Sequence, residues 1–303
     1  MKNKVVVIIG PTASGKTALS LKLAKKKGAE IVSADSCQIY KEMNIGTAKP
    51  TKKEMARIKH YLIDIKKPSE DYTVAEYKRD ALNAINKIIA SGKLPIVVGG
   101  TGLYISAVVN NLEIPEVKPN LALRKKVEAK IKKYGLQSAF EELVELDPEA
   151  TYIVDSRNPR RVIRALEVAI LTGKPFTDQR KQGQKLFNFL QIGIKIPDQI
   201  LRKRIELRTK MMVHNGLVKE VKKLIGKYNK KQKAFDAIGY REIIDYLDGK
   251  ITLSEAEKLI SLNTWHFAKR QITWFKKYAP NAIWLKPNEY QKAEKLVKKF
   301  LGK

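Results

Sequence analysis

The eight residues from 10 to 17 have the pattern of a phosphate-binding loop, G-x-x-x-x-G-K-[ST]. In such a loop, the backbone N–H groups and the start of the following helix point at anionic oxygens. Lys16 adds a positive charge, and the Thr17 hydroxyl is the expected ligand of Mg²⁺. The pattern predicts a polyphosphate site, without specifying ATP, formed by Gly10, Pro11, Thr12, Ala13, Ser14, Gly15, Lys16 and Thr17.

A second polar segment, Asp35-Ser36-Cys37-Gln38, follows a predicted strand. Ligands of an open parallel sheet bind outside the carboxyl ends of the strands, so we expect Asp35 to lie near the phosphate loop. A carboxylate there can accept a proton or bind a metal ion. Gln38 carries the carboxamide group that pairs with N6 and N7 of adenine. The alternative is a turn that only ends the strand.

The third segment, Gly99-Gly100-Thr101-Gly102, also follows a predicted buried strand. Its glycines allow the backbone to approach a ligand closely, and the Thr101 hydroxyl can donate a hydrogen bond to a phosphate oxygen. Three strand ends would then meet in one crevice. A flexible connection between strand and helix is the simpler alternative.

Arginines gather at the start of a predicted helix in the middle of the chain, at Arg157, Arg160, Arg161 and Arg164. Positions 160 and 164 are neighbours on one helix face, as are 161 and 164. Guanidinium groups in such a cluster suit phosphates, as in nucleic-acid binding. A solvated helix face would carry the same residues.

Two later segments, 239–241 and 269–275, mix basic and aromatic side chains. Aromatic rings beside arginine can stack on unpaired bases, although Trp274 and Phe275 also fit a hydrophobic core. Arg204 and Arg208 repeat the spacing of neighbours on one helix face. The three histidines are far apart and show no metal-binding spacing.

Strands and helices that alternate in the first third of the chain would position these groups. Continuous apolar runs separated by helical patterns indicate a parallel α/β sheet, with strands expected at 4–9, 31–34, 61–65 and 94–98. Helices are expected at 17–27 and at 74–91, the latter ending at Gly92.

The segment from 118 to 186 shows only helical signals, at 122–134, at 136–146, after Asp147-Pro148, and from Asn158-Pro159 to Gly173. Pro115 and Pro119 mark its start. The α/β pattern resumes with a strand at 189–196. Later elements are expected at 199–213, 217–228, 239–247, 254–278 (with Ser254 and Glu257 as a capping box), 282–285 and 290–301. We therefore expect a core of residues 1–117 and 187–303 with a helical insertion domain at 118–186.

The composition bounds the class of protein. Of 303 residues, 44% are apolar, which excludes a disordered chain, and no apolar stretch of about 18 residues predicts a membrane span. The single cysteine, Cys37, indicates a reducing, cytoplasmic setting. Nothing in the sequence demands more than a monomer.

The net charge of +29 suggests a polyanionic partner, or a lysine-rich surface that is merely well solvated. Residues 1–117 carry 19 basic and 11 acidic side chains, and residues 118–303 carry 41 and 20. The larger excess in the second part predicts that it supplies most of the contact with a polyanion.

Taken together, seven segments resemble the tRNA dimethylallyltransferase (isopentenyltransferase) family. They follow the order of that family, and the run Ile-Gly-Thr-Ala-Lys-Pro after Asp-Ser-x-Gln is the most specific of them. The resemblance extends over nearly the whole chain and is carried by residues 10–17, 35–41, 44–50, 99–104, 160–167, 237–241 and 269–275.

The resemblance implies a P-loop NTPase-like parallel sheet core with a helical insertion. It also implies transfer of a dimethylallyl group from dimethylallyl diphosphate to N6 of the adenosine 3′ of the tRNA anticodon. Lys16, Thr17-bound Mg²⁺, Thr101 and Arg208 would stabilise the leaving diphosphate. Asp35 would act as the general base and Gln38 would orient the adenine.

The adenine has to leave the anticodon-loop stack to reach the crevice. The resemblance further implies that the helical insertion grips the tRNA anticodon stem. The implied tRNA contacts are Asp35, Ser36, Cys37, Gln38, Thr101, Arg124, Arg160, Arg161, Val162, Ile163, Arg164, Gly239, Tyr240, Arg241, Lys269, Arg270 and Gln271.

Three other functions share parts of this pattern. A small-molecule P-loop kinase would share the phosphate loop and the sheet. An isopentenyltransferase acting on free adenine nucleotides would share the crevice but would not need the basic second part. A non-catalytic RNA-binding ATPase would bind RNA and consume no dimethylallyl diphosphate.

Overall fold

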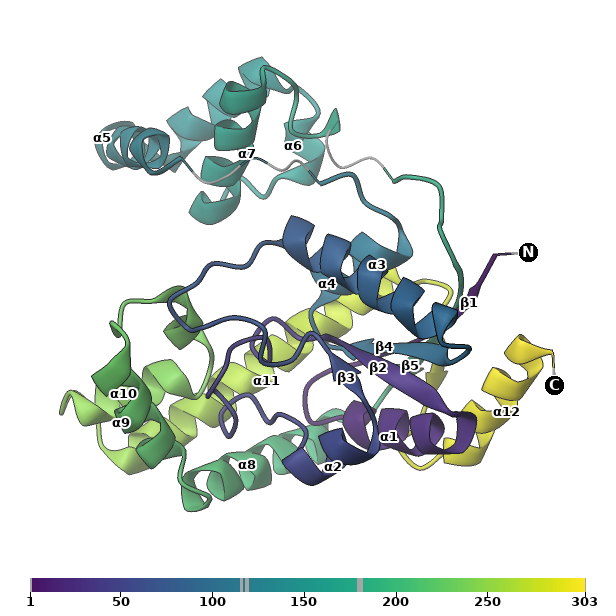
Figure 1. Ribbon diagram of the computed structural model, residues 1–303. Coiled ribbons are helices and arrows are strands. Elements are labelled where there is room, and N and C mark those ends of the chain that lie inside the picture. The colour runs from purple at the N-terminus through teal and green to yellow at the C-terminus, as the bar shows by residue number, and fades with distance from the viewer. Residues whose placement is uncertain (1, 115–116, 118–119, 179–181, 303) are drawn as a thin grey trace. The chain divides into compact units, whose positions relative to one another are not determined.

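The computed structural model describes residues 2–114, 117, 120–178 and 182–302. It divides into two compact units: Met1–Val109 with Leu186–Lys303, called the core unit below, and Asn110–Lys185, called the helical unit. The chain enters the helical unit after the helix at Gly102–Val109 and returns to the core unit just before the strand at Asn188–Ile194 (Figure 1). Pro115 and Pro119, the predicted boundary markers, lie outside the described residues.

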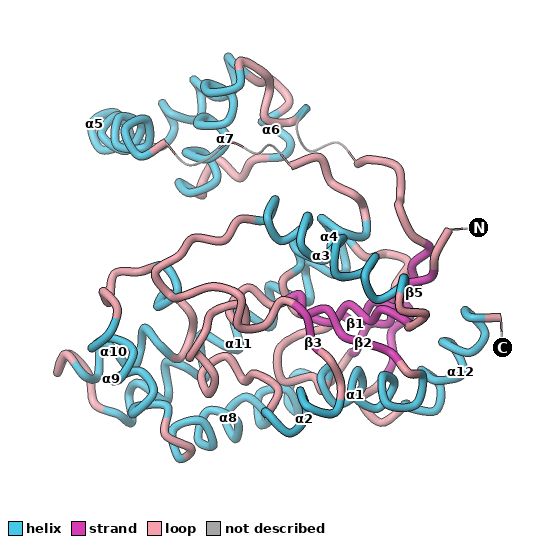
Figure 2. Tube along the Cα trace, in the orientation of Figure 1, coloured by secondary structure: helices cyan, strands magenta, loops and turns pink. Residues whose placement is uncertain are grey.

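Six parallel strands form the sheet of the core unit, in the order β3-β2-β4-β1-β5-β6. Figure 2 draws the strands in magenta. The central strand β1 pairs with β4 on one side and β5 on the other, so that Val6 lies between Ile96 and Leu190. The predicted parallel α/β sheet is therefore confirmed. The strands are β1 Lys4–Ile9, β2 Ala29–Ala34, β3 His60–Tyr61, β4 Leu94–Gly99, β5 Asn188–Ile194 and β6 Ile283–Leu285.

Alternate residues of β1 face two separate hydrophobic clusters, because successive side chains of a strand point to opposite faces. Val5, Val7 and Ile9 pack with helices on one face, and Val6 and Ile8 with helices on the other. The first face is covered by α3 Val74–Ala90, α4 Gly102–Val109 and α11 Leu253–Tyr278, the second by α1 Lys16–Lys27 and α12 Tyr290–Leu301.

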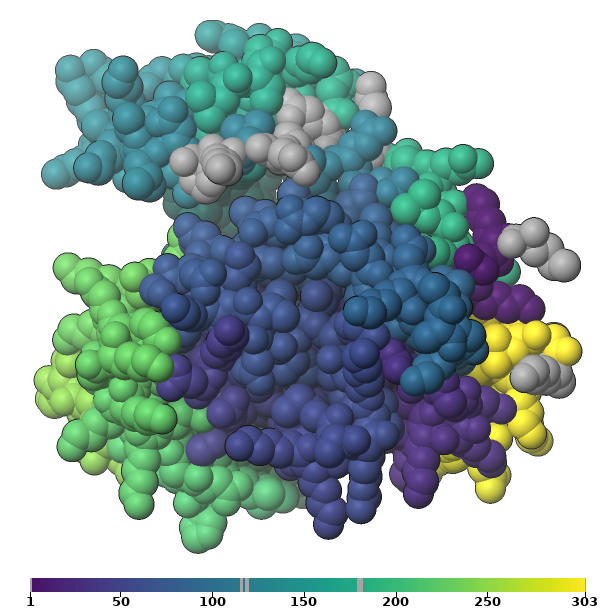
Figure 3. All heavy atoms as spheres, in the orientation of Figure 1, coloured from purple at the N-terminus to yellow at the C-terminus, as the bar shows by residue number. Residues whose placement is uncertain are grey.

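Helix α12 ties the C-terminal end of the chain to its beginning. Glu294 forms a 2.8 Å ion pair with Lys26 at the end of α1. Figure 3 shows the yellow C-terminal segment beside the purple N-terminal one. Both helices predicted here, 17–27 and 290–301, agree with the structure to within one residue.

The predicted strand 61–65 is too long. Leu62 and Asp64 have φ values of 62° and 56°, in the left-handed region, which interrupts an extended strand. Pairing with β2 therefore stops at Tyr61. Short helix α2 Lys52–Arg57 precedes this strand and is capped by Thr51 and Glu54.

A third hydrophobic cluster joins the C-terminal helices of the core unit to Met43, a residue of the long connection after β2. The predicted capping residues of α11 are wrong by two positions. Thr252 and Glu255 form the capping box, which begins the helix at Leu253. The further elements of this region are α8 Asp198–His214, α9 Leu217–Lys227, the short 3₁₀ helix η2 Lys233–Asp236 and α10 Tyr240–Leu247.

The helical unit contains α5 Leu121–Leu146, α6 Ala150–Ile153 and α7 Pro159–Thr172. Gly135 interrupts α5 with φ 84°, which matches the two helices predicted on either side of it. Asn158 caps α7 and Gly173 ends it, as predicted.

The prediction that Asp147 and Pro148 start a helix is wrong. Asp147 is buried and instead accepts hydrogen bonds from the backbone N–H and hydroxyl of Thr177, at 2.9 and 2.7 Å. Within the described parts of both units, no helix is long and apolar enough to cross a membrane.

Candidate active site

The phosphate loop connects β1 to α1, as its pattern requires. Gly10 and Gly15 have positive φ values, 147° and 98°, and a side chain at Gly10 would lie 2.9 Å from the carbonyl oxygen of Ile194. The loop therefore needs glycine at positions 10 and 15. The Lys16 ammonium folds back to donate a hydrogen bond to the Pro11 carbonyl, at 2.6 Å.

Burial lowers the pKa of Lys16 to about 7. Asp35 acts in the opposite direction and Arg208 adds to the decrease. Burial also lowers the pKa of the Arg208 guanidinium, which Asp35 acts to raise. Two half-buried basic groups thus line the same cavity as one carboxylate, an arrangement that favours binding of an anion.

Helices from the second half of the chain hold the phosphate loop. Arg208 on α8 donates to the Thr12 hydroxyl at 3.2 Å. Gln271 on α11 accepts from the Thr12 backbone N–H at 2.8 Å and donates to the Gly100 carbonyl at 2.9 Å. Gln271 was expected to contact tRNA, but its buried carboxamide links the phosphate loop to the loop after β4.

The segment after β2 turns on the Asp35 side chain. Its Oδ1 accepts from the backbone N–H groups of Cys37 and Gln38, at 2.9 and 3.3 Å. Thr101 Oγ1 accepts from the Ser36 backbone N–H at 3.0 Å, which joins this turn to the loop after β4. Burial, together with Asp35, raises the pKa of the Cys37 thiol to about 12.

The Gln38 side chain is held by the protein itself. Its amide nitrogen donates to the carbonyls of Thr47 and Ala48, both at 3.3 Å, and its oxygen accepts from Ser33 at 3.3 Å. Gln38 therefore attaches the segment 44–50 to the strand end. Pairing of this carboxamide with adenine, as the sequence suggested, would compete with these contacts.

Two cavities meet in the core unit. The first, of about 420 Å³, is lined by the phosphate loop, by the ends of β2 and β4, and by His60. The second, of about 310 Å³, is lined by Cys37, Thr101, Arg270 and helices α8 and α11. Both cavities share the residues Thr12, Asp35, Thr47, Arg208 and Phe267.

Two of the arginines assigned to tRNA binding have another role in the helical unit. Arg124 binds both carboxylate oxygens of the fully buried Glu167, each at 2.9 Å, and Arg164 binds it at 2.6 Å. Burial acts to raise the pKa of Glu167, but the two guanidinium groups hold it below its usual value. These half-buried arginines therefore compensate a buried carboxylate of this unit.

Other assigned tRNA contacts differ in exposure. The side chains of Val162 and Tyr240 are fully buried, so direct contact of these two side chains with tRNA does not fit the structure, whereas Ile163 is half-buried. Gly239 has φ 98° and precedes α10. The exposed members of the assigned set are Arg160, Arg161, Arg241, Lys269 and Arg270.

Sequence reasoning missed Glu220 and Lys49. Glu220 on α9 accepts hydrogen bonds from the backbone of residues 44–46. Lys49, whose side chain is 3% exposed, donates to the carboxylate of Asp64 at 2.5 Å and to Asn44 at 3.1 Å. No local signal distinguishes Glu220 from other acidic residues of an amphipathic helix, because its backbone partners lie 174 to 176 positions away.

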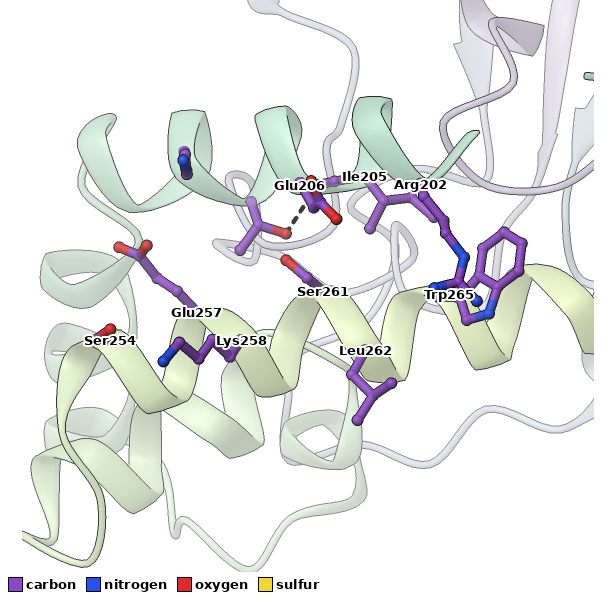
Figure 4. Close-up of a pocket in the computed structure, with 11 residues that line it drawn as sticks. Arg202, Ile205, Glu206, Ser254, Glu257, Lys258, Ser261, Leu262 and Trp265 are labelled. Atoms are coloured by element: carbon purple, nitrogen blue, oxygen red, sulfur yellow. Dashed lines mark hydrogen bonds between the residues drawn. The ribbon is translucent and has the colours of Figure 1, made fainter. Parts of the chain in front are cut away.

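A separate groove lies between α8 and α11 (Figure 4). Its Arg202 guanidinium stacks over the Trp265 ring at 4.2 Å, and Leu262 lines it with 48% of its surface exposed. Figure 4 shows the side chains of Arg202 and Trp265 together at one end. None of the predicted site residues line this groove.

The sequence model of the family described as IPP transferase matches residues 38–278. This chain belongs to the IPP transferase family. Two curated relatives are the tRNA dimethylallyltransferases of Acetivibrio thermocellus, 45% identical over 98% of this chain and 96% of that protein, and Halalkalibacterium halodurans, 42% identical over 94% and 91%.

Solved structures of IPP transferases share the fold. The tRNA isopentenylpyrophosphate transferase of Bacillus halodurans is 39% identical with a TM-score of 0.74, and the comparison covers 99% of this chain and 97% of that one. A eukaryotic dimethylallyltransferase, described as acting on tRNA, is 27% identical with a TM-score of 0.81 over 98% of this chain and 77% of that one. The resemblance inferred from the sequence motifs is confirmed.

Proposed function

We propose that this chain transfers a dimethylallyl group from dimethylallyl diphosphate to N6 of the adenosine 3′ of the anticodon in tRNA. The relatives named tRNA dimethylallyltransferase support the reaction class. The observation that carries the proposal is the meeting of two cavities at Asp35 and Arg208, one lined by most of the phosphate loop and one reached by only Thr12 of that loop. A diphosphate donor and a base acceptor each need such a site.

The diphosphate would occupy the first cavity, against the amides of residues 10–17. Lys16 and Arg208, both half-buried and both lining this cavity, supply positive charge where negative charge grows on the leaving group. Thr101, held by the Ser36 backbone N–H, lines the second cavity and would assist from the loop after β4, where the two cavities meet.

Mg²⁺ fits this cavity. The ion typically binds one or two protein oxygens and completes its shell with water and substrate phosphates. Thr17 and Asp35 both line the first cavity, and the described residues hold no cluster of three metal-ligating side chains that would compete for it. Bound there with the substrate, the ion would offset the charge of the diphosphate.

The reaction would take place where the cavities meet. The N6 lone pair forms a bond to the first carbon of the dimethylallyl group as the bond from that carbon to the diphosphate oxygen breaks. The bonding electrons leave with the diphosphate. The proton lost from N6 passes to the Asp35 carboxylate, which lines both cavities.

Contact with tRNA would use exposed basic groups of both units. Arg160 and Arg161 are exposed on α7 of the helical unit, and Arg241 and Arg270 are exposed on α10 and α11 of the core unit. Guanidinium groups suit RNA phosphates and also stack on bases. The excess of 41 basic over 20 acidic side chains beyond residue 117 supports this assignment.

The test supplies labelled dimethylallyl diphosphate and Mg²⁺ with tRNA or with AMP. We expect label in tRNA and none in AMP. A tRNA with guanosine in place of the target adenosine serves as the control and should remain unlabelled. Label in AMP alone, or transfer of phosphate from ATP without prenyl transfer, would overturn the proposal.

A further inference from the structure

Three successive backbone N–H groups point at one carboxylate in the core unit. Those of Asn44, Ile45 and Gly46 donate to Glu220 of α9, at 3.0, 2.9 and 3.3 Å. Successive amides of this kind form a concave anion site. Here the anion belongs to the protein itself, and it comes from a helix far along the chain.

The carboxylate is fixed from its other side by Tyr240. The phenol of Tyr240 donates to Glu220 Oε1 at 2.6 Å, and its ring is fully buried. Gly46 packs so closely against this ring that a side chain at that position would overlap it. Hydrogen bonds to an ionised acceptor are stronger than those between neutral groups, so this contact anchors the loop 44–46 firmly.

The anchored loop in turn holds Gln38. The carbonyls of Thr47 and Ala48 accept the Gln38 amide at 3.3 Å each, and the Thr47 hydroxyl donates to the Met43 carbonyl at 2.6 Å. Gln38 lines the first cavity, and Thr47 lines both. The chain of contacts therefore runs from Glu220, through the loop, to the place where the cavities meet.

We propose that Glu220 is a positioning residue for the transfer reaction. It lines neither cavity, and it acts through the loop 44–48 by fixing Thr47 and Gln38 beside Asp35. This inference rests on the proposed function for its kinetic consequence. Its structural part, the attachment of the loop to α9, can be tested without any activity.

The kinetic test is Glu220→Gln, which keeps the size of the side chain but removes its charge and one acceptor. A misplacement of about 1 Å away from the chemistry can lower a rate about 100-fold, so we expect a loss of that order in kcat/KM for tRNA. Affinity for dimethylallyl diphosphate should stay unchanged, because the phosphate loop is held by other residues.

Glu42→Gln is the matched control. Glu42 lies near the same loop and pairs with Lys227 of the same helix at 2.6 Å, but it accepts none of the three amides. It should retain the kinetics of the unmodified protein. Equal activity of the Glu220 and Glu42 variants would overturn the proposal, as would equal losses of diphosphate and tRNA affinity.

A double variant separates positioning from general destabilisation. If Glu220 acts through Gln38, then Glu220→Gln should add little to the loss already caused by Gln38→Ala, because residues that share one network are not additive. If the activity loss of the double variant equals the product of the two single losses, Glu220 does not act through Gln38.

Amide hydrogen exchange gives a readout independent of catalysis. In Glu220→Gln, the amides of residues 44–46 should lose protection while those within α9 keep it. An unmodified protein that transfers nothing to tRNA would count against the proposed function alone. Unchanged protection of the loop in the variant would overturn the role of Glu220, whatever the activity.

Discussion

Each unit of this protein places two half-buried basic side chains around one carboxylate, and the two clusters differ in how well the charges are paired. In the helical unit, Arg124 and Arg164 share the fully buried carboxylate of Glu167, at 2.6 to 2.9 Å. In the core unit, Lys16 and Arg208 lie near Asp35, and burial lowers the pKa of both basic groups. A buried charge that is already paired supports the structure, whereas one that is poorly compensated favours a ligand.

The largest effect is expected from Asp35→Asn, which removes the carboxylate at the centre of the core-unit cluster. General base catalysis contributes about 100- to 10,000-fold, so turnover should fall by about 1,000-fold while diphosphate still binds. Single-turnover transfer to tRNA measures this. Asp71→Asn, which alters an exposed ion pair, is the control. Near-normal turnover in Asp35→Asn would show that another group accepts the proton.

Glu167→Gln tests the other half of the comparison. Loss of this charge leaves two guanidinium groups insufficiently compensated, and breaking a buried ion pair destabilises by about 3 kcal/mol. Chemical denaturation should show the loss, and diphosphate affinity should not change. Glu142→Gln, which breaks a partly exposed pair with Lys130 in the same unit, should cost less than about 1 kcal/mol. Equal stability of both variants would show that the ion pairs of Glu167 contribute no more to folding than the partly exposed pair of Glu142 with Lys130.

Arg208→Ala should lower the affinity for diphosphate and leave the stability unchanged, the reverse of what we expect for Glu167→Gln. We expect diphosphate affinity to fall about 30-fold, since a hydrogen bond to a charged group contributes about 2 kcal/mol, while stability is retained. Calorimetric titration and thermal denaturation measure the two quantities. Arg202→Ala, on the same helix and stacked over Trp265, is the matched control and should leave the affinity unchanged. A large loss of stability in Arg208→Ala would make that arginine structural as well.

The smallest effect concerns pH. Because the pKa of Lys16 is lowered to about 7, the ammonium is charged below pH 7 and loses its proton above it. The bound diphosphate favours the charged form, so affinity should decline as pH rises from 7 to 9, by about tenfold at most over the whole range. Lys16→Arg remains charged over this range and should give a flatter profile. Parallel profiles would assign the pH dependence to another group.

Much of this arrangement could be predicted from local sequence. The strands β1 and β4 are continuous apolar runs, and the phosphate loop has a pattern that fixes its position between a strand and a helix. Strand β3 could not be predicted correctly, because the left-handed conformations of Leu62 and Asp64 follow from their tertiary surroundings. Exposed arginines such as Arg160 and half-buried, ion-paired ones such as Arg164 look alike in sequence.

The contacts that hold the loops and pair the buried charge could not be predicted from local sequence either, because they also depend on the tertiary structure. Arg164 and Glu167 are three positions apart, a spacing that also suits an ion pair, but Arg124 joins them from another helix. Gln271 reaches the phosphate loop from 259 positions away. Such pairs depend on how the helices pack, and the motif containing Gln271 gave no sign that its side chain is buried.

The helical unit lies in the sequence between strands that pair in the sheet, and this order affects synthesis of the chain. Strand β1 ends at Ile9, but its partner β5 begins only at Asn188, after the whole helical unit. At roughly 5–20 residues per second, a ribosome needs on the order of 10 to 40 seconds to make the intervening chain. During that time β1, the most apolar strand, has an unpaired edge. The nascent chain is thus expected to depend on chaperones until β5 emerges.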